Sequence, residues 1–354
     1  MTRTETALAP LIRNAEATLV EYQMDRASVP VIVPDPRPSL PHRGRCWTTC
    51  LESAAVGFVM DEWRAKKNPG GLLSAVGHGI SGVMSCGPWR RAVQVGSLPF
   101  STTVRCGNTG ETMWRILPEL RREMPERPFA VRNVLKADLP AQLPEDAVLL
   151  PVRAVYVQDF ADGRPPRSKH YRRDFRLLER AGLQQLEDKD FDEKRVDELL
   201  ALYQQLYRNR YSIRHPDFTL EMIRLARSRG WLELGGLADP VTGRLLGCFA
   251  LHVAGRVVTT PIFGHDLRMP VTEGLYRQLS TVVTDLAVKM RAYENTSSGA
   301  GEFKRRRAFK PELEYLMMMP PLGGPRRTGD RAFLKACAAM MRKITVDDFL
   351  AAGG

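Results

Sequence analysis

A cluster of cations near the C-terminus is the part of the sequence best suited to chemistry. The stretch ENTSSGAGEFKRRRAFKPELEY, residues 294–315, passes from small residues into five Lys or Arg between Lys304 and Lys310. A cation beside a Gly-Ala-Gly turn can hold a phosphate group or stabilise an oxyanion during acyl transfer. The same composition is also typical of a solvated loop. The sequence alone leaves both interpretations open.

The family resemblance described below implies transfer of an acyl group to an amine, a reaction that requires few protein groups. The amine must be held near the carbonyl carbon and lose a proton, and the developing oxyanion must be stabilised. We predict Lys304 as the stabilising cation, with a surface lysine as the alternative. His265 and Asp266 end an expected strand and are the first candidates for the base, with turn residues as the alternative. Glu302 and Tyr315 are further candidates for that role.

A second basic stretch, RPPRSKHYRRDFRLLERAGL at 164–183, contains seven Lys or Arg and two acids. After Pro166 it consists of good helix formers, which predicts either a solvated connecting helix or a helix that faces phosphates. The predicted phosphate-binding residues of the two basic stretches are Arg167, Lys169, Arg172, Arg173, Arg176, Arg305, Arg306 and Arg307. The predicted substrate pocket contains Gly299, Gly301, Glu302, Tyr276 and Tyr315. A structural role is the alternative for the two tyrosines.

Composition and charge describe a globular chain that attracts polyanions. The 354 residues, 44% hydrophobic and 26% charged, are enough for two domains. A net charge of +12 favours an anionic partner. No stretch is apolar and long enough to span a membrane, and no signal-peptide pattern is present, so we expect a cytoplasmic protein. The six cysteines lack metal-site spacing, so we expect reduced thiols and no metal.

Hydrophobic periodicity and turn residues predict helices mixed with strands in both halves of the chain. The expected helices cover 5–25, 46–65, 108–124, 192–211, 219–230, 271–291 and 330–344. The expected strands cover 92–95, 101–106, 129–135, 147–160, 231–239, 244–253, 256–266 and 313–319, and prolines favour an extended chain over 29–45. These elements predict an α/β protein of the α+β kind, with a mixed sheet.

The element order of the second half is two helices, a three-stranded meander, a helix, a strand and a helix. This order, with GLYRQL at 274–279 and NTSSGAGEFKRRRAFKPELEY at 295–315, resembles the C-terminal domain of one branch of the GNAT acyltransferases. That branch contains the FemABX aminoacyl transferases and the CelD/BioF2-like acyltransferases, and the resemblance covers roughly 165–320. It implies two GNAT-like lobes in one chain, the first degenerate. The implied parts are an N-terminal extension (1–45), a degenerate lobe (46–163), a basic connecting helix (164–183) and a C-terminal lobe (184–354).

The resemblance also implies an activity. FemABX transferases take their acyl group from charged tRNA, so the implied donor is aminoacyl-tRNA, no further cofactor is expected, and the acceptor is an amine of a small molecule, peptide or cell-wall precursor. Lys304 matches the lysine that follows phenylalanine in the family motif. The glycine turn that holds the CoA pyrophosphate in acetyl-CoA-dependent GNAT enzymes is replaced by GHDLRMPVTEG, 264–274, where Pro270 removes an N–H. An N-acyltransferase that uses acyl-CoA or a carrier-protein thioester, and a non-catalytic RNA-binding module, are the alternatives.

Overall fold

A computed structural model describes most of the chain. The described residues are 2–24, 27–36, 39–40, 44–51, 53–54, 88–105, 108–323 and 327–351. Most of the helix predicted over 46–65 lies outside them, as do Cys86 and Cys106. The four described cysteines are free and buried, as expected for reduced thiols.

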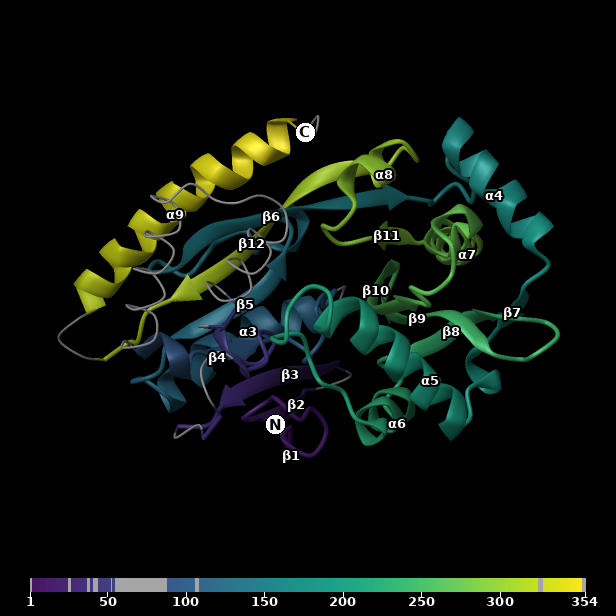
Figure 1. The fold of residues 1–354 in the computed structure, drawn as a ribbon. Helices are drawn as coiled ribbons and strands as arrows, with labels where there is room; N and C mark the ends of the chain where they lie inside the picture. Colours follow the sequence, from purple (N-terminus) through teal and green to yellow (C-terminus); the bar gives the residue numbers. More distant parts are fainter. Residues whose placement is uncertain are drawn as a thin grey trace.

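A twelve-stranded mixed sheet forms the centre of the molecule (Figure 1). Its strand order is β1-β2-β3-β4-β5-β12-β6-β11-β10-β9-β8-β7, and only β4 with β5 and β10 with β11 pair in parallel. The predicted mixed α/β class is therefore confirmed. The strands are β1 (Thr2–Ala7), β2 (Ala17–Met24), β3 (Ala27–Pro34), β4 (Val93–Val95), β5 (Phe129–Val134), β6 (Val148–Asp159), β7 (Gln184–Leu186), β8 (Glu233–Ala238), β9 (Leu245–Ala254), β10 (Val257–His265), β11 (Tyr293–Asn295) and β12 (Lys310–Met319).

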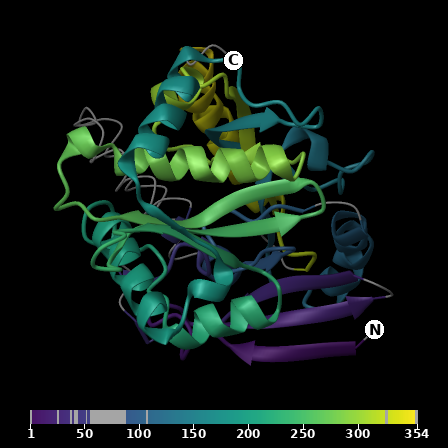
Figure 2. The same cartoon turned by 90° about the vertical axis from the view of Figure 1, so that its right-hand side faces the viewer.

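Helices cover both faces of this sheet. The long helix α9 lies along β6 and β12, and α4 stands beside α7 (Figure 1). Figure 2 shows β1 to β3, in purple, at the edge of the sheet near the N-terminus. The α-helices are α3 (Asn108–Glu123), α4 (Lys169–Ala181), α5 (Glu193–Tyr203), α6 (Leu220–Ser228), α7 (Leu275–Lys289), α8 (Gly301–Arg305) and α9 (Arg327–Ala351).

The N-terminal strands correct one prediction. Residues 5–25, predicted as a helix, contain the end of β1, a turn and β2, and β2 pairs antiparallel with β1 and β3. Pro10 lacks the N–H that a helix interior requires, and the β-branched and aromatic residues of β2 favour a pleated strand. The strand predicted over 101–106 is also wrong over its described part, 101–105. That segment is a loop, and in it a side chain takes the place of a neighbouring strand as hydrogen-bond partner. The backbone N–H of Thr103 donates to Asn133 Oδ1 (3.2 Å).

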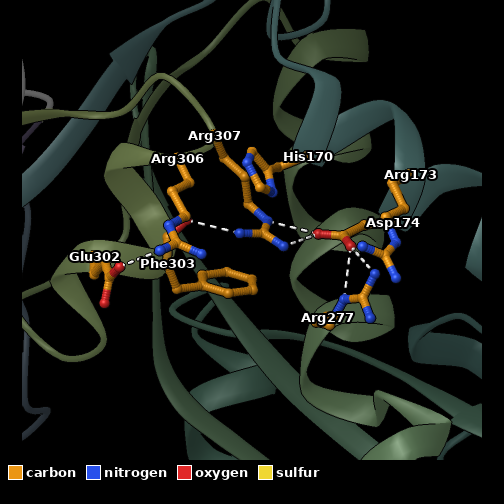
Figure 3. A pocket seen from close by; sticks show the side chains of 8 residues that line it. All are labelled: His170, Arg173, Asp174, Arg277, Glu302, Phe303, Arg306 and Arg307. Atoms are coloured by element: carbon orange, nitrogen blue, oxygen red, sulfur yellow. Dashed lines mark hydrogen bonds and ion pairs between the residues drawn. The ribbon is translucent and has the colours of Figure 1, made fainter.

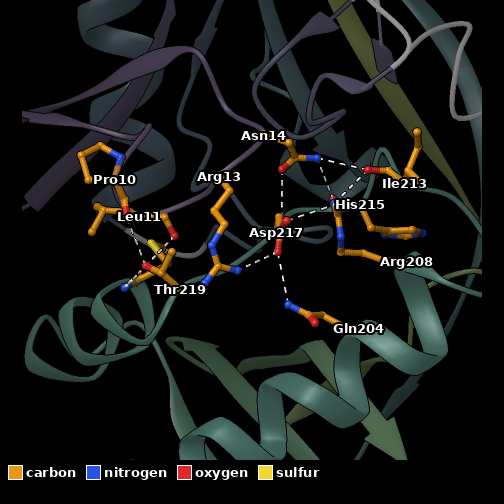
Figure 4. A network of polar contacts seen from close by, with 11 residues as sticks. Pro10, Leu11, Arg13, Asn14, Gln204, Arg208, Ile213, His215, Asp217 and Thr219 are labelled. Carbon is orange, nitrogen blue, oxygen red and sulfur yellow. Dashed lines mark hydrogen bonds and ion pairs between the residues drawn. The ribbon is translucent and has the colours of Figure 1, made fainter. Parts of the chain in front are cut away.

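The turn between β1 and β2 is bound to the second half of the chain (Figure 4). Asn14 Nδ2 donates to the carbonyl oxygens of Ile213 (3.2 Å) and His215 (3.0 Å). Asn14 Oδ1 accepts a hydrogen bond from the backbone N–H of Asp217 (2.9 Å). One buried amide therefore ties the N-terminal segment to the loop that precedes α6.

The elements predicted for the second half occur in the predicted order, and the structure adds β7, β11 and α8, which the sequence analysis does not predict. Strands β8, β9 and β10 form the meander, and α7 connects β10 to the parallel strand β11. The β10–β11 pairing ends at Thr259 and Asn295. Beyond this point β10 contains a bulge, while Thr296 N donates to the carbonyl oxygen of Tyr156 in β6 (2.9 Å). The two parallel strands thus part from each other beyond this point.

The two halves of the chain share strands and core. Strand β12 lies between β5 and β6, so it pairs with strands of the first half. One hydrophobic cluster joins Leu8 and Phe100 with Tyr203, Phe218 and Ile262. The predicted division into four parts stays a prediction, but its lobes are packed through common side chains.

Replacing Phe100 tests this shared core. Phe100 is 0% exposed, and its ring centroid lies 5.9 Å from that of Phe218. We expect Phe100→Ala to lower the free energy of unfolding by about 3–5 kcal/mol, because it leaves a cavity between the two halves. Urea unfolding measures the change. Phe175→Ala on α4, where the ring is 37% exposed, is the matched control and should change it by less than about 1 kcal/mol. Equal, small effects of both variants would contradict a shared core.

Candidate functional site

An open pocket of about 290 Å³ lies where α4, α7 and α8 meet (Figure 3). Ser168 positions two of these elements, because its Oγ caps α4 by accepting from His170 N (3.1 Å) and donates to the carbonyl oxygen of Arg306 (2.5 Å). The lining residues are His170, Arg173, Asp174, Arg277, Glu302, Phe303, Arg306 and Arg307.

The Asp174 carboxylate holds the three helices of the pocket together. Its side chain is 1% exposed and forms ion pairs with Arg277 of α7 and Arg307, which follows α8. Arg277 Nε lies 2.7 Å from Oδ1, and Arg307 Nε lies 2.6 Å from Oδ2. The Arg307 guanidinium also stacks on the Phe303 ring, 3.4 Å from its centroid. The buried charge is therefore fully compensated.

The remaining groups give the pocket an excess of positive charge. Its four arginines face two carboxylates, Asp174 and Glu302, and Glu302 is paired with Arg306. Partial desolvation and the nearby Arg307 and Arg306 lower the pKa of His170, so its imidazole is neutral at pH 7. An oxyanion such as a phosphate suits this environment, because guanidinium groups bind oxyanions through charge-assisted hydrogen bonds.

The outer side of α4 extends this positive charge. We call five exposed cations the basic face of α4: Arg167, Lys169, Arg172, Arg173 and Arg176. None of them forms an ion pair with another residue that the structure describes. The half-exposed ring of Phe175 lies in the same segment. Cations around an aromatic ring are typical of surfaces that bind single-stranded nucleic acid.

The structure brings together part of the predicted site. Arg173, Glu302, Arg306 and Arg307 line one pocket, but Arg307 binds Asp174 instead of facing solvent. The sequence analysis does not predict Asp174, Arg277 or Phe303 for the site. One signal for Asp174 exists in the sequence, because it shares the buried face of α4 with Tyr171 and Leu178 at helical spacing.

Lys304 has a structural environment that differs from the predicted one. Its side chain is 6% exposed, and Nζ donates to the carbonyl oxygens of Thr296 (2.5 Å) and Ser297 (3.1 Å). Nζ also lies 5.7 Å from the centre of the Tyr156 ring. Gly301 opens α8 close to that ring, and a Cβ there would overlap Tyr156 Oη. Lys304 thus anchors the chain after β11 and is not placed to meet an oxyanion directly.

Arg305, the residue after Lys304, also contacts Tyr156. Its Nη1 donates to Tyr156 Oη (2.9 Å), so it fixes the ring against α8. Gly299 is exposed in the loop before α8. Tyr315 packs with the cluster around Val131 and Met317 and does not line the pocket. The predicted pocket roles of Gly299 and Tyr315 are therefore not supported by their positions.

Asp266 and His265 have different environments although they are neighbours. Asp266 is buried and pairs with Arg268 (2.9 Å) and Arg244 (2.5 Å). The hydrogen bonds from Arg268 hold its pKa well below the usual range, so Asp266 is a turn residue and not the base. Burial lowers the pKa of His265, and its Nδ1 has no hydrogen-bond partner in the described structure. Its ring lies 6.1 Å from that of Tyr276, which in turn lies 4.9 Å from Phe303.

Glu294 is a buried acid that the sequence analysis does not predict for the site. It lies on β11, where Thr284 Oγ1 donates to its Oε1 (3.4 Å), and its Oε2 has no partner in the described structure. Burial raises the pKa of Glu294 to about 8, despite the opposing effects of Thr284 and Lys304. Glu294 is therefore mostly a neutral acid at pH 7.

The N-terminus of α7 is covered in this structure. Gly274 precedes α7 with φ of 66°, and a Cβ there would lie 2.8 Å from Cδ2 of Leu177 on α4. In the predicted fold this helix N-terminus is the place where a CoA pyrophosphate binds. Leu177 and the Arg277–Asp174 ion pair occupy its surroundings instead.

Comparison with protein-family models gives no match, and comparison with curated proteins gives none either. Solved structures with a similar fold include L-PGS from Bacillus licheniformis, with 10% identity, a TM-score of 0.47, and coverage of 64% of this chain and 79% of that one. The C-terminal domain of a putative lysylphosphatidylglycerol synthetase from Agrobacterium fabrum has 13% identity and a TM-score of 0.47, over 71% and 82% of the two chains. A tandem GNAT protein from the clavulanic acid biosynthesis pathway has 14% identity and a TM-score of 0.37, over 66% and 76%. These distant likenesses assign no activity or substrate to this chain.

Two features are absent from the described residues. These residues contain no group of three or more His, Cys, Asp or Glu side chains arranged to hold a metal ion. Within the same residues, every helix is too short or too polar to cross a bilayer.

Removing the Asp174 carboxylate tests the ion pairs of the pocket. We expect Asp174→Ala to lower the free energy of unfolding by about 3–5 kcal/mol, because two guanidinium groups lose their counter-charge. Glu179→Ala, an exposed acid on the same helix, is the control and should change it by less than about 0.5 kcal/mol. Urea unfolding of both variants at one salt concentration makes the comparison. Similar values for the two would show that Asp174 does not hold the helices together.

The raised pKa of Glu294 predicts a pH dependence of stability. The folded protein holds this proton up to a pH of about 8, whereas the unfolded chain releases it near the ordinary value of 4.5. The contribution of Glu294 to the free energy of unfolding is therefore complete below pH 4.5. It decreases as the pH rises to 8, by at most about 1.4 kcal/mol per pH unit. Glu294→Gln should flatten the slope of unfolding free energy against pH in this window. Glu302→Gln, at an exposed acid, is the control, and an unchanged slope in Glu294→Gln would refute the assignment.

Proposed function

We propose that this protein is an amide-forming acyltransferase that moves an aminoacyl group from aminoacyl-tRNA to an amine acceptor. The observation that carries the proposal is the arginine-lined pocket beside the basic face of α4. The element order around the parted strands β10 and β11 supports the acyltransferase part, because it matches the order that the sequence resemblance implies. The acceptor is the amine of a small molecule, a peptide or a cell-wall precursor.

The charge distribution favours a nucleic-acid donor. Four exposed cations on α4, with Arg167 just before it, can follow a phosphate backbone, and the pocket next to them can hold the phosphate that precedes the terminal nucleotide. The surroundings of the α7 N-terminus argue against acyl-CoA, because Leu177 Cδ2 would lie 2.8 Å from a Cβ at Gly274, the residue before the helix, and leaves little room there for a pyrophosphate. An acidic carrier protein with a thioester is the second candidate, since the same basic face would attract it.

The proposed reaction needs positioning and one base. The amine nitrogen attacks the carbonyl carbon of the aminoacyl ester, the amide bond forms, and the ester C–O bond breaks. The ribose hydroxyl of the tRNA leaves with a proton, and the amine loses one. We assign the base to His265, because its imidazole is neutral and Nδ1 has no partner within the described structure. Lys304 acts indirectly by holding the chain after β11.

A transfer assay tests the donor. The protein is mixed with tRNA charged with radiolabelled amino acids and with a set of amine acceptors. Label that moves to an amine and is lost after RNase treatment is the expected result. Transfer from acyl-CoA or a carrier thioester that resists RNase would replace the tRNA donor with a thioester. Tight binding of tRNA without any transfer would identify a non-catalytic RNA-binding module.

Charge reversal on α4 tests the proposed tRNA surface separately. We expect Arg172→Glu, Arg173→Glu and Arg176→Glu together to weaken tRNA binding and to lower the slope of log affinity against log salt by about 0.7 to 0.9 per lost phosphate contact. The control carries the same charge change at exposed lysines elsewhere, with Lys136→Glu, Lys194→Glu and Lys335→Glu. Filter binding between low and moderate salt measures both slopes. Equal slopes in the two variants would assign α4 to the solvated surface.

A further inference from the structure

A bulge in β5 changes the direction of a buried arginine. Val131 of β5 pairs with Met317 of β12, and Val134 pairs with Tyr315. The two residues between them on β5, Arg132 and Asn133, therefore lie opposite the single residue Leu316 of β12. Asn133, the second residue of the bulge, has φ of 53°. Bulges of this kind re-aim a side chain and are common next to functional sites, and a positive φ outside glycine carries a conformational cost. The local backbone is thus built around Arg132.

The Arg132 guanidinium is buried with most of its donors unused. The residue is 4% exposed, and Nη2 donates to the carbonyl oxygens of Leu98 (3.0 Å) and Phe100 (3.4 Å). Nε and Nη1 have no partner in the described structure. The carbon of the guanidinium lies 5.5 Å from the centre of the Trp47 ring. Since an arginine has five N–H donors, the N–H of Nε and both of Nη1 remain without an acceptor.

A second buried arginine lies beside it. Arg105 donates to the carbonyl oxygens of Gly96 (2.6 Å) and Arg132 (2.6 Å), so neutral oxygens surround its charge. Burial lowers the pKa of Arg105 to about 10 and that of Arg132 to about 9, where Arg105 adds to the effect. Glu314 is close enough to raise the pKa of both arginines, but its carboxylate is bound to Arg153 (2.7 Å). Among the described residues, no carboxylate forms an ion pair with either arginine.

Two adjacent buried cations without an anion are an unfavourable arrangement. A buried guanidinium is stable when a counter-ion and hydrogen-bond acceptors satisfy it, and one that lacks them carries its full desolvation cost. The π face of the Trp47 ring offsets only part of the desolvation cost of the Arg132 charge. An anion with oxygen acceptors would meet both needs of Arg132.

The loop over Arg132 connects this arginine to the parted strands. Residues 97–103 supply the two carbonyl oxygens that bind Arg132. In the same loop Ser101 Oγ donates to the carbonyl oxygen of Pro261 in the β10 bulge (3.1 Å), and Thr102 Oγ1 donates to Ser297 Oγ after β11 (3.4 Å). An ion held by Arg132 would therefore lie at the junction of both halves of the sheet.

We infer that Arg132 is the centre of an internal binding site for a small oxyanion, a carboxylate or phosphate-like group. The ion is bound by Nε and Nη1 of Arg132, between the β5 bulge, loop 97–103 and Trp47. This site is separate from the arginine-lined pocket at α4 and does not depend on the proposed transferase activity.

Thermal unfolding with added ions tests the site. The protein is unfolded in Bis-Tris chloride at constant ionic strength with increasing acetate, phosphate or sulfate. We expect at least one ion to raise the Tm of the wild type by a few degrees in a saturable way. Acetate and phosphate as separate arms distinguish a carboxylate from a phosphate site. Arg173→Gln removes one arginine of the α4 pocket and should keep the response to the Arg132 site. Adding Arg132→Gln to this variant should abolish the response that Arg173→Gln keeps.

Two results would overturn this inference. A response that is lost in Arg173→Gln and kept in Arg132→Gln would place the ion in the α4 pocket and overturn the inference. A wild-type Tm that responds to none of the three ions would also overturn it. If Arg132→Gln does not fold, Arg132→Met removes the buried charge at similar volume. That variant should be no less stable than the wild type in Bis-Tris chloride alone, and insensitive to the ion that stabilises the wild type.

Discussion

Compensation of the buried Asp174 charge is the constraint on which the candidate site depends. A carboxylate that is 1% exposed requires cations at close range, and Arg277 and Arg307 supply them from two other elements. Helix α4 can therefore pack in one orientation only, with Asp174 inward. The basic face points outward as a consequence, and the pocket forms between α4, α7 and α8.

The same packing also sets the surroundings of the α7 N-terminus. Because Asp174 draws Arg277 toward α4, Leu177 comes to lie against the start of α7, where a pyrophosphate would otherwise bind. The N-terminus of α7 has little room to bind an anion. The site offers instead the cationic side chains on the convex outer surface of α4. A convex row of cations fits an extended polyanion better than a compact nucleotide.

Local patterns in the sequence predict most elements of both halves, including β4, α3, β5 and β6 in the first half. They miss the N-terminal strands β1 and β2 and, in the second half, the short elements β7, β11 and α8. Thr219 caps α6 as expected, and the meander β8 to β10 follows its hydrophobic runs and turns. Residues 5–25 have helical spacing too, but strand pairing with β3 and the bond from Asn14 to His215 override it. Of these partners, β3 follows β2 directly in the chain, whereas His215 lies far away in sequence. The pairing of Asp174 and the burial of Lys304 have the same long-range origin, so a basic cluster in the sequence cannot show which cations are structural.

Mapping the contact of a tRNA 3′ end with the protein tests the central claim most directly. A tRNA with a photoreactive group at its terminal nucleotide is cross-linked to the full chain, and the modified peptides are identified by mass spectrometry. Cross-links to peptides of α4 and α8, which surround the arginine-lined pocket, are expected. Cross-links confined to α9 or to the edge strands β1 to β3 would contradict it.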